Sequence, residues 1–222
     1  DWDGKIRMDC SSPHAMASLI ERMRPDADGE APFDVATGND ADADRHGIVT
    51  PDGGLMNPNH FLAVAIEYLF THRPEWPEGC AVGKTLVSSS LIDRVVAAMG
   101  RTLIEVPVGF KWISAKMAET GAVIGGESSG GLTVRGHIPG KDGVYAGSLL
   151  VEAVAASGKR LSELYADIVA RYGELVMVEN AYGFTSERRA ELEERIFGAH
   201  DLPAFAHDVE RISWQDGCKA YF

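Results

Sequence analysis

The pattern of apolar and polar positions along the chain predicts helices and strands that follow one another in turn. Apolar residues at helical spacing, bounded by glycine and proline, predict helices at 14–24, 58–73, 91–99, 110–120, 143–156, 161–172 and 187–197. Short apolar runs predict strands at 33–37, 46–50, 81–88, 102–106, 122–124, 132–135 and 174–180. Strands separated by helices of this length indicate β-α-β units. We therefore expect an α/β fold with a mixed, mainly parallel sheet and flanking helices, followed by an irregular C-terminal stretch.

Composition narrows the range of partners. The chain has 222 residues, of which 45% are hydrophobic and 24% charged, so a soluble globular protein with a sizeable core is expected. The net charge is -12 and no segment gathers Lys and Arg, which argues against nucleic acid as a partner. No apolar run approaches the ~20 residues that span a bilayer, so no membrane partner is expected. A few local cations could still hold a small anionic substrate.

The three cysteines, Cys10, Cys80 and Cys218, lie far apart in the sequence. Their odd number and the lack of a Cys-x-x-Cys pair argue against a disulfide framework and against a zinc site. Such cysteine usage suits the reducing cytoplasm, where we expect this protein to be.

Three aspartates at alternate positions, Asp40, Asp42 and Asp44, form the most informative segment. In an extended or turning backbone, alternate side chains can converge on one side. Convergent ionised carboxylates repel one another and need a cation, and ligands that are all oxygen select a hard ion such as Mg²⁺ or Ca²⁺. Arg45 follows directly, and its guanidinium could hold an anionic substrate or a phosphate beside the metal.

Several other interpretations compete for this acidic segment. Solvated acidic turns are common. An EF-hand is rejected because its sixth and twelfth positions, which need Gly and Glu, hold Arg45 and Pro51. Two alternatives stay open: a non-catalytic module that binds metal and sugar phosphate, and an aspartyl-phosphate phosphatase that uses Asp40 or Asp42. In a haloacid-dehalogenase-type phosphatase, however, Thr or Val usually stands where this chain has Asp44.

A glycine-rich segment, 125–131, forms the second candidate site. Taken alone it could be a mobile hairpin turn. Its functional interpretation is a sharply bent backbone from which Glu127 and Ser129 present oxygen atoms to a ligand, as the hydroxyl groups of a sugar require. His137, a little further on, could face the same site, although a lone histidine is more often structural.

The acidic segment resembles the metal loop of the α-D-phosphohexomutases, usually written Asp-Gly-Asp-Gly/Ala-Asp-Arg. Segments 6–13, 39–50 and 55–60 are similar to the bacterial phosphoglucomutase branch of that family. The resemblance implies that Asp40, Asp42 and Asp44 hold Mg²⁺, which would act as a Lewis acid on the transferring phosphoryl group. It also implies that Arg45 supplies positive charge near that phosphate.

Three further segments carry the resemblance. The glycine-rich segment is similar to the sugar-recognition loop Gly-Glu-Glu-Ser-Gly, with Ser128 in place of the second Glu, and this implies that Glu127 and Ser129 contact sugar hydroxyls. Residues 106–111 resemble the Pro-Thr-Gly-Phe-Lys stretch, which implies that Lys111 is a catalytic cation in the active cleft. Lys141 begins a Lys-Asp-Gly segment that the resemblance places at the cleft edge as a substrate-binding residue.

The resemblance also implies a domain organisation and an activity. Residues 1–55 would end the second domain, 56–173 would form the third, and 174–222 would begin the fourth. The family's phosphoserine loop, Thr-Ala-Ser-His-Asn-Pro, and its Arg-Pro-Ser-Gly-Thr loop do not occur in this sequence. We therefore expect part of a phosphoglucomutase or phosphomannomutase that interconverts hexose 1-phosphate and hexose 6-phosphate through a phosphoserine and glucose 1,6-bisphosphate. The partners would be the hexose phosphate and the missing N- and C-terminal domains, without which the chain should be inactive.

Overall fold

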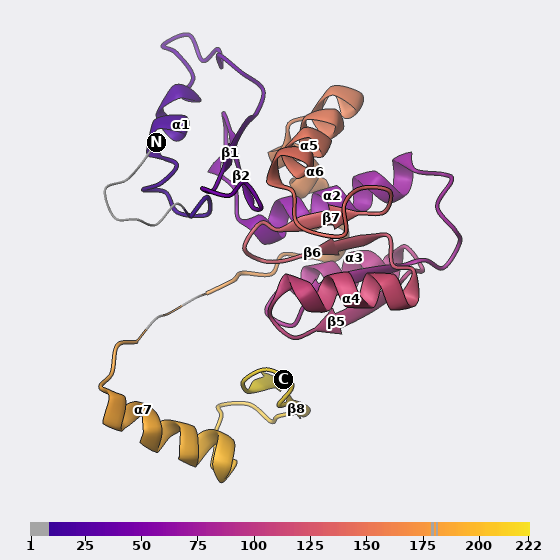
Figure 1. Ribbon diagram of the computed structural model, residues 1–222. Coiled ribbons are helices and arrows are strands. Elements are labelled where there is room, and N and C mark those ends of the chain that lie inside the picture. The colour runs from indigo at the N-terminus through magenta and orange to yellow at the C-terminus, as the bar shows by residue number, and fades with distance from the viewer. Residues whose placement is uncertain (1–8, 179, 181) are drawn as a thin grey trace. The chain divides into compact units, whose positions relative to one another are not determined.

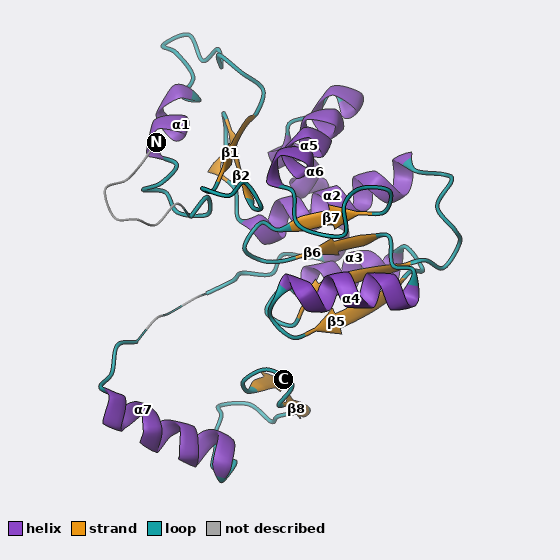
Figure 2. Cartoon of the chain, in the orientation of Figure 1, coloured by secondary structure: helices purple, strands orange, loops and turns teal. Residues whose placement is uncertain are grey.

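The computed structural model describes residues 9–178, 180 and 182–222 (Figure 1). The chain divides into two compact units, Asp1–Leu175 and Val176–Phe222. Figure 2 distinguishes their helices, strands and loops. In the first unit the helices are α1 (Ala17–Arg22), α2 (Pro58–His72), α3 (Leu91–Ala98), α4 (Phe110–Thr120), α5 (Gly143–Ser157) and α6 (Leu161–Tyr172). Its strands are β1 (Ala36–Asn39), β2 (His46–Thr50), β3 (Gly54–Leu55), β4 (Ala81–Thr85), β5 (Thr102–Val106), β6 (Ile124–Gly126) and β7 (Leu132–Val134).

The main sheet has four strands in the order β5-β4-β6-β7. β4 pairs in parallel with β5 and with β6, whereas β7 returns antiparallel to β6. The predicted mixed, mainly parallel sheet with flanking helices is therefore confirmed. Because parallel strands end at the same edge of a sheet, the loops that follow β4, β5 and β6 lie at one edge. The glycine-rich loop follows β6, and the Lys111 segment follows β5.

Two glycines at the end of β6 allow helices to pack closely on both faces of the sheet. A Cβ atom added to Gly125 would clash with Ile113 of α4, and one added to Gly126 would clash with Leu62 of α2. Successive residues of a strand point to opposite faces, so α4 covers one face and α2 the other. Figure 1 shows α4 in front of the sheet and α3 behind it. Our prediction placed these two glycines in a loop after a strand at 122–124, and the observed strand lies two residues later.

Local signals explain where the long helices begin. Asn57 caps α2, since its side-chain oxygen accepts a hydrogen bond from the main-chain N–H of Asn59 at 2.9 Å, and Pro58 occupies the first helical position. Asp142 caps α5 in the same way, accepting from the N–H of Tyr145 at 2.9 Å. Both helices lie where the sequence predicted them.

A small antiparallel sheet, β1-β2-β3, carries the acidic loop between its first two strands. All five residues of β2 are buried. Ile48 packs into the main core with Phe61, whereas Val49 packs with Cys10, Met16 and Met23 in a second cluster. Because apolar groups cover β2 on both sides, the strand is a firm base for the loop that precedes it. α1 is shorter than the predicted helix at 14–24.

The second unit consists of α7 (Ser186–Glu193), a π-helical turn (Glu194–Gly198) and a hairpin of β8 (Arg211–Ser213) with β9 (Lys219–Tyr221). The charged helix at 187–197 was predicted, but the hairpin was not. The predicted strand at 174–180 was wrong: none of its described residues, 174–178 and 180, is in a strand. Its side chains are largely open to solvent, and Val176 is 78% exposed. None of the described residues of this unit is buried.

No helix among the described residues is long and apolar enough to cross a membrane.

Among the residues of the first unit that the structure describes, the most buried charge is Lys84 of β4, whose side chain is fully buried. Its Nζ atom lies 2.8 Å from Asp93 Oδ2 on α3 and 3.6 Å from Glu105 Oε2 on β5. It also donates to the main-chain oxygens of Ser88 and Ser89 at 3.3 Å each. This one cation therefore joins two strands, a helix and the loop after β4.

We expect Lys84→Met to lower the free energy of unfolding by about 2 kcal/mol, because two partly exposed carboxylates and two carbonyls lose a charged donor. Urea unfolding followed by circular dichroism measures the change. Lys116→Met is the matched control, since Lys116 pairs with Glu119 at 2.8 Å on an exposed face and such a pair contributes at most about 0.5 kcal/mol. Equal losses in the two variants would contradict the assignment of Lys84 as a structural cation.

Candidate functional site

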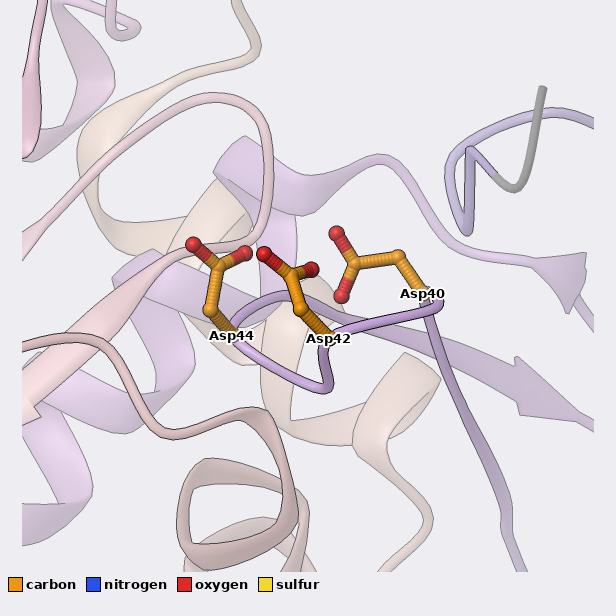
Figure 3. A group of neighbouring side chains, drawn as sticks. All are labelled: Asp40, Asp42 and Asp44. Atoms are coloured by element: carbon orange, nitrogen blue, oxygen red, sulfur yellow. The ribbon is translucent and has the colours of Figure 1, made fainter.

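The three aspartates of the acidic loop converge in the structure. Asp40, Asp42 and Asp44 each offer a carboxylate oxygen, and these atoms lie within 4.8 Å of one another. Figure 3 shows the three carboxylates side by side along one side of the loop. A tight turn brings them together: the N–H of Ala43 donates to the carbonyl of Asp40 at 3.0 Å, and Ala43 adopts a left-handed conformation with φ 57°. The Cβ atom makes that conformation strained, although less so for alanine than for a bulky or β-branched residue.

Arg45 holds the first aspartate from two directions. Its main-chain N–H donates to Asp40 Oδ1 at 3.0 Å, and its guanidinium Nε donates to Oδ2 at 2.5 Å. Burial alone would raise the pKa of Asp40, but these hydrogen bonds outweigh it, so the pKa lies below its usual value. Asp40 is therefore ionised at neutral pH although its side chain is almost fully buried. Arg45 also approaches Asp44, with Nε 3.6 Å from Oδ1.

Lys141 connects the acidic loop to the glycine-rich loop. Its Nζ atom lies 2.6 Å from Asp44 Oδ2 and 4.0 Å from Glu127 Oε2. Ser129 Oγ donates to the same Glu127 oxygen at 3.4 Å. The Glu127 side chain is 10% exposed and that of Lys141 is 21% exposed, so their interaction is shielded in part from solvent. One ammonium group thus brings a candidate metal ligand and both candidate sugar contacts into one site.

Main-chain contacts hold the same two loops together. Arg45 forms a β-bridge with Gly131, and the N–H of the next residue, His46, donates to the carbonyl of Gly130 at 3.1 Å. The N–H of Gly143, at the start of α5, donates to the carbonyl of Ala43 at 2.8 Å. The acidic loop, the glycine-rich loop and the start of α5 therefore meet at one place.

Hydrogen bonds to the next residue, Asp142, stabilise the segment that carries Lys141. Asp142 accepts hydrogen bonds from the N–H of Tyr145 and, at 2.8 Å, from His137 Nε2, and both lower the pKa of Asp142. The ring of His137 stacks on Tyr145 with centroids 3.9 Å apart. His137 thus steadies the segment that carries Lys141, and it makes no hydrogen bond to Glu127 or to the acidic loop among the described residues.

Lys111 lies in the first turn of α4, where it is exposed. Its Nζ atom lies 5.0 Å from the centroid of the Trp112 ring, and no contact joins it to the acidic loop or to Glu127 among the described residues. Its neighbour Phe110 does reach the site, with its ring centroid 5.9 Å from Lys141 Nζ. The structure therefore brings the Lys111 segment to the site but does not bring the Lys111 ammonium into contact with the other candidate residues.

Sequence reasoning missed His46, which follows Arg45 and is buried beside the site. Its Nδ1 atom lies 2.6 Å from the carbonyl oxygen of Gly130, and its ring packs against Phe61. Burial lowers the pKa of His46 to about 4, although the hydrogen bond with Gly130 raises it in part. The sequence signal was weak, since a histidine in a buried strand usually indicates only a satisfied core residue.

The residues of the acidic loop fit a divalent cation. A carboxylate oxygen can accept more than one contact, so the hydrogen bonds from Arg45 and the ion pair with Lys141 leave acceptor capacity on Asp40 and Asp44. Asp42 is exposed and makes no hydrogen bond to a described residue. With Glu127, which Lys141 also contacts, four carboxylates face two cations among the described residues. A hard divalent cation with oxygen ligands would balance the two remaining negative charges.

Comparisons with known proteins show which family the chain belongs to. Residues 57–172 match the family described as phosphoglucomutase/phosphomannomutase, alpha/beta/alpha domain III. The chain belongs to the phosphoglucomutase/phosphomannomutase family. It is 49% identical over 178 residues to a phosphoglucomutase of Komagataeibacter xylinus, a match that covers 78% of this chain and 31% of that protein. The resemblance to bacterial phosphoglucomutases that the motifs indicated is confirmed.

Other members of the phosphoglucomutase/phosphomannomutase family extend the similarity. A phosphoglucosamine mutase of Solibacter usitatus is 30% identical over 213 residues, covering 93% of this chain and 42% of that protein. A solved structure from Thermus thermophilus, described as a phosphomannomutase, has a TM-score of 0.72 and 29% identity, over 95% of this chain and 42% of that one. The matches thus span only 31% to 42% of the length of the relatives described here.

The burial of His46 predicts a pH dependence of stability. In the unfolded chain His46 binds a proton below its usual pKa of 6.5, whereas the folded protein binds it only near pH 4. The unfolded state is therefore favoured as the pH falls from 6.5 to 4, and its stabilisation reaches roughly 3 kcal/mol. Urea unfolding in metal-free buffer at several pH values should show a shallower pH dependence for His46→Leu than for the wild type. His14→Leu, at an exposed histidine, should keep the wild-type dependence, and a wild-type slope in His46→Leu would contradict the prediction.

Proposed function

We propose that this chain supplies the metal loop and the sugar-recognition loop of a phosphohexomutase. The enzyme would interconvert hexose 1-phosphate and hexose 6-phosphate through a phosphoserine and a hexose 1,6-bisphosphate. The observation that carries the proposal is the chain of contacts from Asp44 through Lys141 to Glu127, which joins the two loops in one site. The 49% identity to a phosphoglucomutase supports glucose 1-phosphate as the substrate.

In this proposal Asp40, Asp42 and Asp44 hold Mg²⁺. When bound, Mg²⁺ would act as a Lewis acid on the transferring phosphoryl group. Arg45 keeps Asp40 ionised and adds positive charge at the side of the loop where the phosphate would lie. Lys111 would contribute a further positive charge at the same phosphate, from the first turn of α4.

Glu127 and Ser129 would recognise the sugar. A carboxylate that accepts and a hydroxyl that both donates and accepts lie next to each other, which suits two neighbouring hydroxyl groups of a hexose. Lys141 would neutralise Glu127 in part and bind a substrate oxygen at the cleft edge. Glucose 1,6-bisphosphate is the ligand that presents both a sugar and a phosphate to this set of residues.

The remaining parts of the enzyme would be the partners of this chain. We assign residues 1–55 to the end of the second domain, 56–173 to the third and 174–222 to the start of the fourth. The family match at 57–172 and the unit boundary after Leu175 support these bounds. The phosphoserine would come from a segment outside this sequence, in an enzyme of the cytoplasm.

Ligand binding tests the site directly. A ligand that binds only the folded state stabilises it, by about 2.7 kcal/mol at a hundred times its Kd. We expect Mg²⁺ to raise the melting temperature of the chain, and glucose 1,6-bisphosphate to raise it further. Asp42→Asn should abolish the Mg²⁺ effect without loss of stability, because Asp42 is exposed and contacts no described side chain. Differential scanning fluorimetry measures both.

Two control variants separate the parts of the site. Asp28→Asn, at an exposed aspartate outside the acidic loop, should retain the full response to both ligands. Glu127→Gln should keep the response to Mg²⁺ and lose most of the response to the bisphosphate. A wild-type chain that responds to neither ligand would reject the site as assigned. A phosphoaspartate trapped on the acidic loop would favour the phosphatase instead.

Turnover tests the assignment of the missing parts. The 222-residue chain alone should not convert glucose 1-phosphate to glucose 6-phosphate, because it contains no phosphoserine loop of the family type. A chimera in which this chain replaces its equivalent in the Komagataeibacter xylinus phosphoglucomutase should be active in a coupled dehydrogenase assay. Asp42→Asn in the chimera should reduce kcat by about a hundredfold or more. Conversion by the chain alone, or an inactive but folded chimera, would contradict the proposal.

A further inference from the structure

His46 gives two hydrogen bonds to one acceptor, the carbonyl oxygen of Gly130. Its main-chain N–H donates at 3.1 Å, and its ring Nδ1 lies at 2.6 Å from the same atom. A carbonyl oxygen can only accept, so the ring proton must be on Nδ1. A neutral imidazole then has its lone pair on Nε2, and this buried nitrogen has no hydrogen-bond partner among the described residues.

The unpaired nitrogen costs stability, since a buried acceptor without a partner has lost its water. The cavity beside the ring is lined by Phe61, Leu62 and Ala65 and by residues of the glycine-rich loop, and it is too narrow for a water molecule. A leucine would fill this apolar place without that cost. An imidazole at such a position therefore requires an explanation. The only hydrogen bond of the ring among the described residues is the one with Gly130.

Gly130 controls the shape of the loop that carries Glu127 and Ser129. Its N–H donates to the carbonyl of Glu127 at 3.1 Å, and the N–H of Glu127 donates to the carbonyl of Gly131 at 2.9 Å. Gly130 has φ +93°, and a Cβ atom there would clash with the main-chain oxygen of His46. The glycine therefore lies directly against β2, and a displacement of its carbonyl would displace both candidate sugar contacts.

We propose that His46 is a positioning residue that holds the sugar loop, residues 127–131, against the acidic loop. Lys141 joins the two loops through charges on the side open to solvent, whereas His46 joins them through a neutral hydrogen bond on the buried side. Because His46 lies two residues after Asp44, the hydrogen bond sets the distance between the candidate metal ligands and the candidate sugar contacts. The effect on ligand binding rests on the function proposed above, and the effect on the loop does not.

Two substitutions at one position test this role. His46→Leu removes the ring donor and the unpaired nitrogen together. His46→Asn places a side-chain N–H₂ group near the position of Nδ1 and can restore the bond to Gly130. Ile48→Val, on the same buried strand, is the control for a general loss of packing.

Amide hydrogen exchange of the full chain, followed by NMR, reports on the loop itself. We expect His46→Leu to speed exchange at Glu127 and Gly130 by about tenfold relative to the amides of β4, and His46→Asn to recover most of the protection. Ile48→Val should not change that ratio. Unchanged protection in His46→Leu, or equally faster exchange throughout the first unit, would overturn the proposal.

Isothermal titration with glucose 1,6-bisphosphate in the presence of Mg²⁺ gives the second readout. His46→Leu should raise the Kd of the bisphosphate by about tenfold while the Kd of Mg²⁺ stays within twofold, and His46→Asn should recover the bisphosphate affinity. An unchanged bisphosphate Kd in His46→Leu would overturn the positioning role. If the wild-type chain does not bind the bisphosphate, the proposed function fails, and the exchange measurement still decides whether His46 positions the loop.

Discussion

The repulsion among three neighbouring carboxylates is the constraint on which the arrangement of the site depends. Asp40, Asp42 and Asp44 place oxygen atoms within 4.8 Å of one another, and such a group is stable only where positive charge is near. The protein supplies that charge from two directions. Arg45 comes from the same loop, whereas Lys141 comes from the segment before α5 and reaches Glu127 as well. The need to balance the aspartates thus draws distant parts of the chain to one place.

The strands of the two sheets hold these converging loops in place. β2 is buried along its full length and carries the acidic loop at its start, while the parallel strands of the main sheet present their following loops at one edge. The bridge between Arg45 and Gly131 joins the small sheet to the glycine-rich loop of the main sheet. A site made of loops is in this way supported by buried strands on both sides.

The sequence predicted the order of the helices and of most strands of the first unit, and the convergence of the aspartates, because both depend on local spacing. It could not predict the contact between Lys141 and Asp44, since that contact depends on how distant segments pack. It placed Gly125 and Gly126 in a loop, because glycine has a low intrinsic preference for strands and only close helices on both faces explain its presence there.

The strand expected at 174–180 was wrong because an apolar run becomes a strand only beside another strand. The hairpin of β8 and β9 could have been found from Asp216-Gly217, a strong turn signal between two short runs. The role of Lys111 stays a prediction.

The two glycines of β6 have a mechanical consequence. With no side chains between them, the strand and the helices on its two faces come closer at Gly125 and Gly126 than larger residues would allow. The sugar loop begins at the very next residue, Glu127, so it projects from a closely packed part of the sheet. The end of β6 therefore has almost no free space in which to shift between the two helices. A small displacement of the backbone at the base of the loop would become larger towards its tip. Close packing at Gly125 and Gly126 limits that displacement at the base.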